Sequence, residues 1–292
     1  MKIAIVNNSA NADMVEYYKA KKKVYDSQLV YCCGIEQAQM CKGDLISSYS
    51  RANRLTMYFI VDTLISFRLT IKFLLEGVRV IVFDSAHISN LPLAVFAKIF
   101  KRKLVFTIHD WIPHEGRMSK ATSYYNFFIK RYLADHLIVF SKINSDIPHT
   151  IMRLSGIESK FSEREIDGNR FLFFGRIEPY KGLSELYEIA TKMLSDLPQA
   201  KITIMGKGSD ESLELLSKLD NVMIVNRYFT EQELQRELKK TTAVLLPYIS
   251  ATQSGVILKS YASGVPVVAY NVGALSDYVN SGCNGFLIEK GD

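Results

Sequence analysis

The chain of 292 residues lacks most features of a secreted, disulfide-rich or metal-bound protein. It holds only four cysteines, Cys32, Cys33, Cys41 and Cys283, which have neither paired metal-ligand spacing nor the density of a disulfide scaffold. We therefore expect a reducing compartment and no bound metal. The N-terminal stretch MKIAIVNNSA also lacks the long apolar core of a signal peptide. Together these absences predict a cytoplasmic location.

Long apolar runs without charges are missing as well. The most apolar stretch, LTMYFIVDTLISFRLTIKFLLEG, contains Asp62, Arg68 and Lys72. Charges at those depths favour a helix buried in a protein core over a membrane span. The chain has no low-complexity segment, and its composition of 48% hydrophobic and 23% charged residues is globular. Its length suits two domains of ordinary size.

What the chain does have is an uneven charge. Residues 1–165 hold 23 Lys and Arg against 15 Asp and Glu, a balance of +8, whereas the remaining residues have a balance of −2. The basic half is expected to face an anionic partner, and nucleic acid, a lipid surface and a phosphorylated substrate all fit that sign, as does solubility alone. No nucleic-acid recognition motif accompanies the charge, so nucleic acid is not an expected partner.

Short apolar runs alternate with helical patterns along the whole chain. The runs are KIAIVN, SQLVYCC, RVIVFD, KLVFTIHD and HLIVFS in the first half, and RFLFFGR, KITIMGKG, NVMIVNRY, AVLLPY, PVVAY and GFLIEK in the second. They are apolar on both faces, as buried parallel strands are. Helical stretches between them include 91–101, 122–134, 183–197, 231–239 and 257–263, and Thr230 with Glu233 predicts a capping box. This alternation predicts an α/β fold with parallel sheets.

The polar stretch SGIESKFSEREIDGN, residues 155–169, has no apolar periodicity and is typical of a linker. We therefore expect two Rossmann-like, doubly wound domains, residues 1–160 and 161–292, which face each other across a cleft. Ligands of such sheets bind beyond the carboxyl ends of the strands.

Two strand ends of the second half carry small and basic residues. Arg176 and Lys181 follow RFLFFG across a turn that contains Pro179, and two cations at the end of a parallel strand suit a diphosphate. Gly206 lies in IMGKGSD, where glycine lets the backbone turn tightly and approach a ligand. The full dinucleotide fingerprint is missing there, so a nicotinamide cofactor is not indicated. Taken alone, exposed cations near a turn are more often simply solvated.

The loop SATQSGV, residues 250–256, precedes a helical stretch. Ser254, Gly255 and Val256 occupy the positions where the first N–H groups of a helix point outward, and such groups bind anions. Taken alone, a Ser-Gly pair is more typical of an ordinary helix N-cap.

Several segments, taken together, resemble one known family. FFGRIEPYKG, ITIMGKG, AVLLPYISATQSGVILKSYASGVPVVAYNVGALSDYV and CNGFLIEKGD resemble the donor-binding domain of the retaining family-four glycosyltransferases, which have the GT-B architecture. The resemblance is strong from Phe171 to Asp292 and fainter in the first half, where FTIHDWIPH and the strand pattern match. It implies that residues 161–292 bind a nucleotide-sugar and that residues 1–160 lie on the acceptor side.

The resemblance also implies an activity. The chain would move a sugar, with retention, from a UDP- or GDP-sugar to a glycan or lipid-linked acceptor, in the assembly of a surface polysaccharide. Fixed cations and helix N–H groups would take the place of a metal ion, so we expect neither a metal nor another cofactor.

The family's functional residues map onto particular positions here. By resemblance, Arg176 and Lys181 bind the donor diphosphate together with the backbone of Ser254, Gly255 and Val256. His109 and Asp110 are the catalytic candidates, because they end a first-domain strand and would orient the transferred sugar or accept a hydrogen bond from the acceptor. Gln253, Thr252 and Lys259 would contact the donor sugar or ribose, and Gly206 and Tyr228 lie on the nucleotide side.

The sequence departs from the family pattern in two places. Many members carry two glutamates that flank seven residues, and the matching positions here are Ala251 and Lys259. Members with the SATQSGV pattern match more closely; Lys259 would then donate to a ribose hydroxyl or a phosphate. The family also continues into further helices beyond the position of Asp292, so we expect a C-terminally short form.

Three first-half segments, VEYYKAKKKVY, AKIFKRK and SKATSYYNFFIKRYLADH, combine aromatic and basic residues. Such surfaces suit the head groups of an anionic membrane, so we expect peripheral membrane contact through this half. Ordinary packing of aromatic residues beside solvated lysines accounts for any single segment.

Two other functions stay open. A degenerate glycosyltransferase domain would bind a nucleotide or a partner without turnover, which Ala251, Lys259 and the short C-terminus favour. A nucleotide-sugar epimerase of the same architecture would need acid and base carboxylates in the cleft, and none is convincingly placed.

Overall fold

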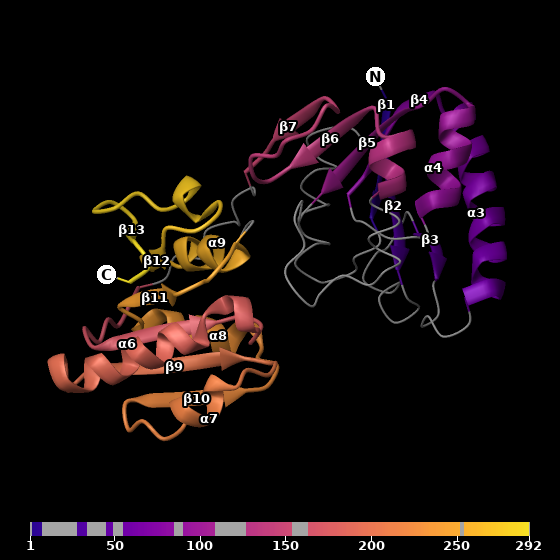
Figure 1. The fold of residues 1–292 in the computed structure, drawn as a ribbon. Coiled ribbons are helices and arrows are strands. Elements are labelled where there is room, and N and C mark those ends of the chain that lie inside the picture. Colours follow the sequence, from indigo (N-terminus) through magenta and orange to yellow (C-terminus); the bar gives the residue numbers. More distant parts are fainter. Residues whose placement is uncertain are drawn as a thin grey trace. The chain divides into compact units, whose positions relative to one another are not determined.

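The computed structural model describes residues 2–7, 28–33, 45–48, 55–84, 90–108, 127–153, 163–251 and 254–291. These residues form two compact units, Met1–Met152 and Arg153–Asp292, which are drawn in Figure 1. The sequence predicted a division after residue 160, slightly later in the chain. Each unit is built on its own parallel sheet.

The sheet of the first unit has seven strands in the order β3-β2-β1-β4-β5-β6-β7. They are β1 (Lys2–Asn7), β2 (Gln28–Cys33), β3 (Leu45–Ser48), β4 (Val78–Phe83), β5 (Lys103–Ile108), β6 (His136–Val139) and β7 (His149–Ile151). All neighbouring pairs are parallel. The sequence missed β3 and β7, the two edge strands, because both are short and lack an apolar run.

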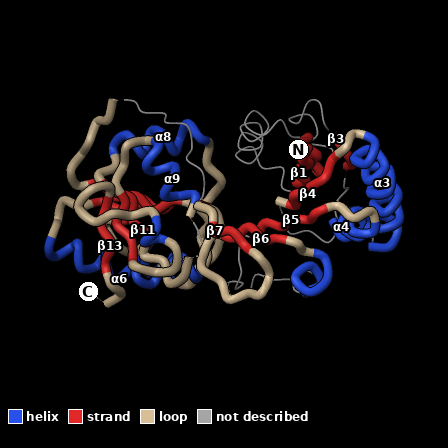
Figure 2. The backbone as a smooth tube through the Cα atoms, turned by 90° about the horizontal axis from the view of Figure 1, so that it is seen from above, coloured by secondary structure: helices blue, strands red, loops and turns tan. Residues whose placement is uncertain are grey.

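Helices pack on this sheet. They are α3 (Leu55–Leu75), α4 (Asn90–Ile99) and the short π-helical segment η1 (Ile129–Leu133). Figure 2 shows α3 and α4 side by side next to β4 and β5. The core beneath contains stacked Phe83 and Phe106 rings, with centroids 4.7 Å apart. Lys98 joins α4 to the start of β6 through a 2.9 Å bond to Asp135.

The sheet of the second unit has six strands in the order β10-β9-β8-β11-β12-β13, again all parallel. They are β8 (Arg170–Phe174), β9 (Lys201–Gly206), β10 (Val222–Asn226), β11 (Ala243–Leu246), β12 (Val267–Tyr270) and β13 (Gly285–Ile288). Each corresponds to a strand expected from the sequence. Because every strand runs in the same direction, all their carboxyl ends lie along one edge of the sheet.

The helical elements of this unit are η2 (Pro179–Lys181), α6 (Leu183–Asp196), α7 (Ser212–Leu216), α8 (Glu231–Lys240), α9 (Gly255–Ala262) and η3 (Leu275–Asp277). The capping box predicted for α8 is confirmed: Thr230 Oγ1 accepts from the Glu233 N–H, and the Glu233 carboxylate accepts from the Thr230 N–H. Helix α9 begins at Gly255, two residues before the predicted start.

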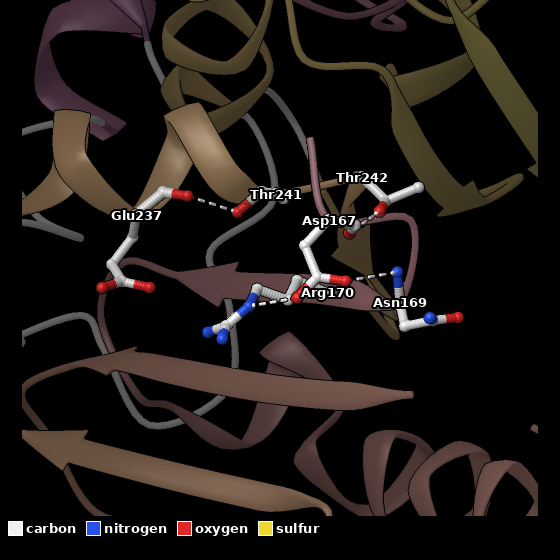
Figure 3. A network of polar contacts seen from close by, with 6 residues as sticks. All are labelled: Asp167, Asn169, Arg170, Glu237, Thr241 and Thr242. Carbon is white, nitrogen blue, oxygen red and sulfur yellow. Dashed lines mark hydrogen bonds and ion pairs between the residues drawn. The ribbon is translucent and has the colours of Figure 1, made fainter. Parts of the chain in front are cut away.

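The starts of β8 and β11 are tied by polar contacts, which Figure 3 shows around Asp167. The Asp167 carboxylate accepts a 2.8 Å bond from Arg170 Nε, and its carbonyl accepts a 2.8 Å bond from Thr242 Oγ1. The Thr242 N–H donates to the Arg170 carbonyl at 2.7 Å. These bonds fix the register of two neighbouring strands at the end of the sheet opposite their carboxyl ends.

One sequence prediction about α3 is wrong in part. Its Leu69 and Phe73 are buried as expected, but Leu64, Phe67, Ile71 and Leu75 are exposed. No described helix is both long enough and apolar enough to cross a membrane. Helix α3 therefore has one buried side and one exposed apolar side.

Candidate functional site

The loops that follow β8, β9 and β11 are bonded to one another at the carboxyl edge of the second sheet. The Gly175 N–H donates to the Met205 carbonyl at 2.9 Å, which joins the ends of β8 and β9. The Ile249 N–H donates to the Tyr180 carbonyl at 2.9 Å, which joins the loop after β11 to η2. Three chain segments distant in sequence are thus held together at this edge.

Close backbone approach at two of these positions requires glycine. A Cβ atom at Gly206 would lie 1.8 Å from the Gly175 carbonyl oxygen, and one at Gly182 would lie 1.8 Å from the Pro247 carbonyl oxygen. Gly182 also has a φ of 71°, in the left-handed region that favours glycine. The structure therefore gives Gly206, predicted to lie on the nucleotide side, a packing role between two strand ends.

Arg176 extends from the loop after β8. Its side chain is exposed, and its Nη1 lies 3.8 Å from a carboxylate oxygen of Glu178. A Cβ atom built on the preceding Gly175 would lie 3.4 Å from Cγ2 of Val256, in the first turn of α9. The backbone next to Arg176 therefore runs beside the start of α9, as expected for two elements that share one ligand.

Lys181, in contrast, is buried. Its Nζ lies 3.7 Å from the centroid of the Tyr248 ring and 5.2 Å from that of Tyr180, so the ammonium lies over aromatic faces. A cation is attracted to the negative face of such a ring, and a ring that is itself packed holds the cation in one place. Tyr248 is fully buried and its ring meets that of Tyr180 edge to face, with centroids 6.5 Å apart.

Two buried hydroxyls lie close together here. Tyr248 Oη and Ser254 Oγ are both inaccessible to solvent, and neither has a hydrogen-bond partner among the described residues. Burial raises the pKa of the Tyr248 hydroxyl, while the nearby Ser254 hydroxyl and Arg176 oppose that rise. The hydroxyls are therefore neighbours, although their geometry is not that of a hydrogen bond. Buried polar groups without partners are rare in folded proteins and need an explanation.

The start of α9 offers donors to the same place. Ser254 occupies the N-cap position with φ −142° and ψ 108°, yet within the described residues its side chain caps no N–H group. The first N–H groups of a helix have no intrahelical partner and carry a partial positive charge. A Cβ atom at Gly255 would meet no heavy atom of the described residues within 4 Å, so space is open at the first helical residue.

Lys259, on the following turn of α9, is directed toward another helix. Its Nζ lies 3.3 Å from a carboxylate oxygen of Glu231, in the first turn of α8. Sequence reasoning proposed Lys259 as a ribose or phosphate ligand and did not foresee this ion pair. A ligand that contacts Lys259 would therefore also lie close to the Glu231 carboxylate.

Tyr228 is 79% exposed, in the loop between β10 and α8. Lys207, which follows β9, has its Nζ 4.8 Å from the centroid of the Tyr228 ring. The Asn226 side chain bonds both the N–H and the carbonyl of Gly208, at 3.2 and 3.1 Å, and so joins the two loops. Tyr228 is thus an exposed aromatic surface beside a lysine.

The remaining predicted site residues, His109, Asp110, Thr252 and Gln253, lie outside the described residues. The described part of the chain contains no group of three or more His, Cys, Asp or Glu side chains suited to a metal ion. Sequence reasoning missed Tyr248. Its only signal was its position two residues after a buried strand, in AVLLPY, a common place for a site residue in parallel sheets.

The arrangement is suited to binding an anion. Arg176, Lys181 and the α9 N–H groups supply positive charge around the two hydroxyls of Tyr248 and Ser254, which supply neutral donors. A phosphate or diphosphate is the kind of ligand that such a set of groups binds.

Comparison with known protein families agrees with this geometry. Residues 168–292 match the family described as "Glycosyl transferases group 1". A D-inositol 3-phosphate glycosyltransferase of Frankia alni is 31% identical over 139 residues, which are 43% of this chain and 34% of that protein. A phosphatidyl-myo-inositol mannosyltransferase of Mycobacterium leprae is 23% identical over 225 residues, 74% of this chain and 55% of the relative. The chain spans about a third of the first relative and about half of the second. The similarity of the second unit to this family, predicted from its motifs, is confirmed.

Solved structures resemble the chain along its whole length. The lipopolysaccharide outer core galactosyltransferase WaaB in its apo form has a TM-score of 0.65 and 16% identity, covering 100% of this chain and 87% of that structure. Sucrose-phosphate synthase from Thermosynechococcus elongatus has a TM-score of 0.70 and 16% identity, covering 100% and 86%. At this identity the likeness concerns the fold alone. The predicted fold class, two Rossmann-like α/β domains of the GT-B type, is confirmed.

Proposed function

We propose that this protein is a glycosyltransferase that takes a sugar from a nucleotide-sugar and that its second unit binds the donor diphosphate. The observation that carries the proposal is the pair of buried hydroxyls, Tyr248 Oη and Ser254 Oγ, which lack partners beside a helix start that no side chain caps. A bound phosphate oxygen would satisfy the hydroxyls and the first N–H groups of α9 together.

Arg176 and Lys181 would act differently on that diphosphate. The Arg176 guanidinium is exposed, with its Nη1 3.8 Å from a Glu178 carboxylate oxygen, and it offers a planar fork that suits phosphate oxygens. The Lys181 ammonium is held over the Tyr248 ring and needs little reordering when the ligand binds. Charge that develops on the leaving diphosphate would be stabilised by these cations and by the α9 N–H groups.

The finer parts of the proposal rest on the sequence resemblance. We expect transfer with retention of configuration, a UDP- or GDP-hexose donor, no requirement for a metal, and a glycan or lipid-linked acceptor in cytoplasmic surface-polysaccharide assembly. The relatives named for inositol-phosphate and phosphatidylinositol acceptors support an acceptor with an anionic group. His109 and Asp110 remain the proposed residues next to the transferred sugar, with Thr252 and Gln253 on the donor side.

A donor panel tests the activity. Release of UDP or GDP from a set of nucleotide-sugars would be measured with EDTA present, with and without added acceptors, and the anomeric configuration of any product would be read by NMR. Sustained nucleotide release in EDTA supports metal-independent transfer, whereas activity that requires added Mg²⁺ or Mn²⁺ contradicts that part.

Variants test the site. Calorimetric titration with UDP and GDP should show about tenfold weaker binding for Arg176→Ala and for Lys181→Ala, because each loses a charge-assisted bond to phosphate. Lys192→Ala, an exposed lysine on α6 of the same unit, is the matched control and should bind as the unchanged protein does. Unchanged binding in both site variants would contradict the diphosphate role.

One observation favours a second candidate, a domain that binds a nucleotide without turnover. At the position where many family members carry a glutamate, this chain has Lys259, and the lysine is already paired with Glu231. Tight UDP binding with no turnover of any donor in the panel would select this alternative.

A further inference from the structure

The outer face of α3 is apolar, although it faces solvent. Leu64, Phe67, Ile71 and Leu75 are exposed, with exposed fractions of 61% for Leu64 and 84% for Leu75. Their spacing of three, four and four residues places them on one side of the helix, which we call the outer stripe. The opposite side packs on the sheet through Leu69 and Phe73. The helix thus has two apolar sides, and only one of them is covered.

The neighbouring helix extends this surface. The Phe67 ring meets the Phe96 ring of α4 edge to face, with centroids 5.6 Å apart. Ile99 and Phe100, at the C-terminal end of α4, are exposed too. Contiguous exposed apolar side chains of this size, on two packed helices, mark an interaction surface.

The charges around the outer stripe are almost all positive. Residues 63–84 and 90–103 contain seven basic side chains, Arg68, Lys72, Arg79, Lys98, Lys101, Arg102 and Lys103, and two acidic ones, Glu76 and Asp84. Asp84 is buried and accepts a 2.6 Å bond from Thr107, and Glu76 lies 3.9 Å from Lys72. Lys98 is offset as well, because its Nζ lies 2.9 Å from a carboxylate oxygen of Asp135. The positive charge of this face therefore comes mainly from Arg68, Arg79, Lys101, Arg102 and Lys103.

The C-terminal ends of the two helices bring the apolar and basic groups together. Helix α3 leads into β4 and α4 leads into β5, and these strands are adjacent, with Val80 paired to Lys103. Helix α3 ends at Leu75 shortly before β4, and α4 ends at Ile99 shortly before β5. The basic run of residues 101–103 follows Ile99. Figure 1 shows α3 and α4 alongside each other in this unit.

We propose that this face of α3 and α4 docks on an anionic lipid bilayer, with the outer stripe in the head-group region and the cations on lipid phosphates. An apolar stripe flanked by Lys and Arg is what a helix lying in the membrane surface presents. Arg68 and Lys72 lie within α3, so the helix lies along the bilayer and does not cross it. A second copy of the chain fits less well, because a two-fold contact would bring like charges together.

The test is flotation of the full chain with vesicles, without any nucleotide-sugar. Vesicles of phosphatidylglycerol and phosphatidylcholine are compared with vesicles of phosphatidylcholine alone, at low and at high salt. We expect binding to the anionic vesicles, at least about tenfold weaker on phosphatidylcholine alone and weakened by salt, because several cations contribute.

Variants assign the surface. Ile71→Glu with Leu75→Glu should reduce the partition coefficient on anionic vesicles by about tenfold or more, because it places two carboxylates in the lipid head-group region. Leu197→Glu with Leu215→Glu, two exposed apolar positions in the second unit, is the matched control, because it adds the same number of carboxylates, and it should bind as the unchanged protein does. Circular dichroism and the thermal midpoint show whether each variant is folded; Arg68→Glu with Lys72→Glu gives a second test of the same face.

Three results would overturn the proposal. The unchanged protein could fail to bind anionic vesicles at low salt. The outer-stripe variants could bind those vesicles as well as the unchanged protein, or the protein could form a concentration-dependent dimer that those variants abolish. The last would show that a second copy covers the outer stripe. Since the test needs no donor, its failure leaves the proposed glycosyltransferase function untouched.

Discussion

The ammonium nitrogen of Lys181 lies 3.7 Å from the centroid of the Tyr248 ring. Both residues are buried, and the Tyr248 hydroxyl is without a partner among the described residues. One side chain therefore positions a cation with its ring and presents a hydroxyl to the start of α9. The two roles can be separated by mutation.

Replacing Tyr248 by Phe removes only the hydroxyl. Since that hydroxyl is buried without a partner, its removal should not lower the free energy of unfolding by more than about 0.5 kcal/mol, and it can raise it. UDP binding should weaken by about tenfold, because one hydrogen bond to phosphate is lost. Tyr248→Leu also removes the ring and should lower the free energy of unfolding by about 1–3 kcal/mol. Urea unfolding and calorimetry measure both effects. Equal destabilisation by Phe and Leu would show that the hydroxyl is bonded in the protein.

Ser254 and Thr230 provide a matched pair of helix N-caps in one unit. The Thr230 side chain caps α8, whereas within the described residues the Ser254 side chain caps nothing. We expect Thr230→Ala to lower the free energy of unfolding by about 1 kcal/mol and Ser254→Ala to leave it nearly unchanged. The order should invert for UDP affinity, which Ser254→Ala lowers and Thr230→Ala does not. A stability loss in Ser254→Ala as large as that in Thr230→Ala would mean that Ser254 serves only as a cap.

Arg164 binds the C-terminal ends of two helices at once. Its Nη1 donates to the Gly264 carbonyl at 2.7 Å, after α9, and its Nη2 donates to the Thr241 carbonyl, after α8. We expect Arg164→Ala to lower the free energy of unfolding by about 1–3 kcal/mol, since a cation at a helix C-terminus and two bonds are lost together. Arg164→Lys keeps the charge without the fork and should recover part of the loss. Hydrogen exchange should show faster amide exchange in the last turns of both helices; a change confined to α8 would contradict the shared role.

The parallel strands of the second sheet could be predicted because they are short apolar runs, and three of them, β8, β9 and β11, end at or directly before a glycine or a proline. The capping box of α8 could be predicted because it depends on two residues three positions apart. In contrast, the contact between Lys181 and Tyr248 joins residues far apart in sequence, and no local pattern indicates it. The same holds for the Lys259–Glu231 ion pair, which links two helices.

The outer stripe of α3 shows another limit of sequence reasoning. A helix with apolar residues on both sides has a weak periodicity, so the sequence predicts a core helix without showing which side is buried. Only the packed sheet shows which side is covered. Strand β7 was missed for the opposite reason, because its three residues are largely exposed and lie at an edge of the sheet.

Glu233 predicts a pH dependence of stability. Hydrogen bonds from Arg227 and from the Thr230 N–H lower its pKa from 4.5 to about 2. A carboxyl group whose pKa is lowered on folding stabilises the protein above its unfolded pKa, and that contribution is lost as the pH falls toward the folded pKa. The thermal midpoint of the unchanged protein should therefore exceed that of Glu233→Gln at pH 7 and at pH 5, and the difference should shrink between pH 4.5 and pH 2. In an Arg227→Gln background, the difference in thermal midpoint between Glu233 and Glu233→Gln should be smaller. A difference in thermal midpoint that is the same at every pH would show that the ionised carboxylate contributes nothing.

Mutations of the Lys259–Glu231 ion pair can show whether it contributes to stability and to recognition of the nucleoside. The pair is partly exposed, so it should contribute only about 0.2–1 kcal/mol to stability, and Lys259→Glu alone should be destabilising by a similar amount because two carboxylates would then face each other. The exchange Lys259→Glu with Glu231→Lys should restore the ion pair and the stability. It also places a carboxylate on α9, where many members of the resembling family carry one.

Binding of UDP and of 2′-deoxy-UDP, measured by calorimetry, separates the ligand role of this pair from its structural role. A carboxylate that accepts a hydrogen bond from the 2′-hydroxyl makes UDP bind more tightly, by about tenfold for one charge-assisted bond. Glu231→Gln should therefore reduce the preference for UDP, and the exchanged pair should retain it. The preference for UDP over 2′-deoxy-UDP is compared in the unchanged protein, Lys259→Glu, Glu231→Gln and the exchanged pair. If all four show the same preference, the pair lies away from the ribose and serves only to hold α8 against α9.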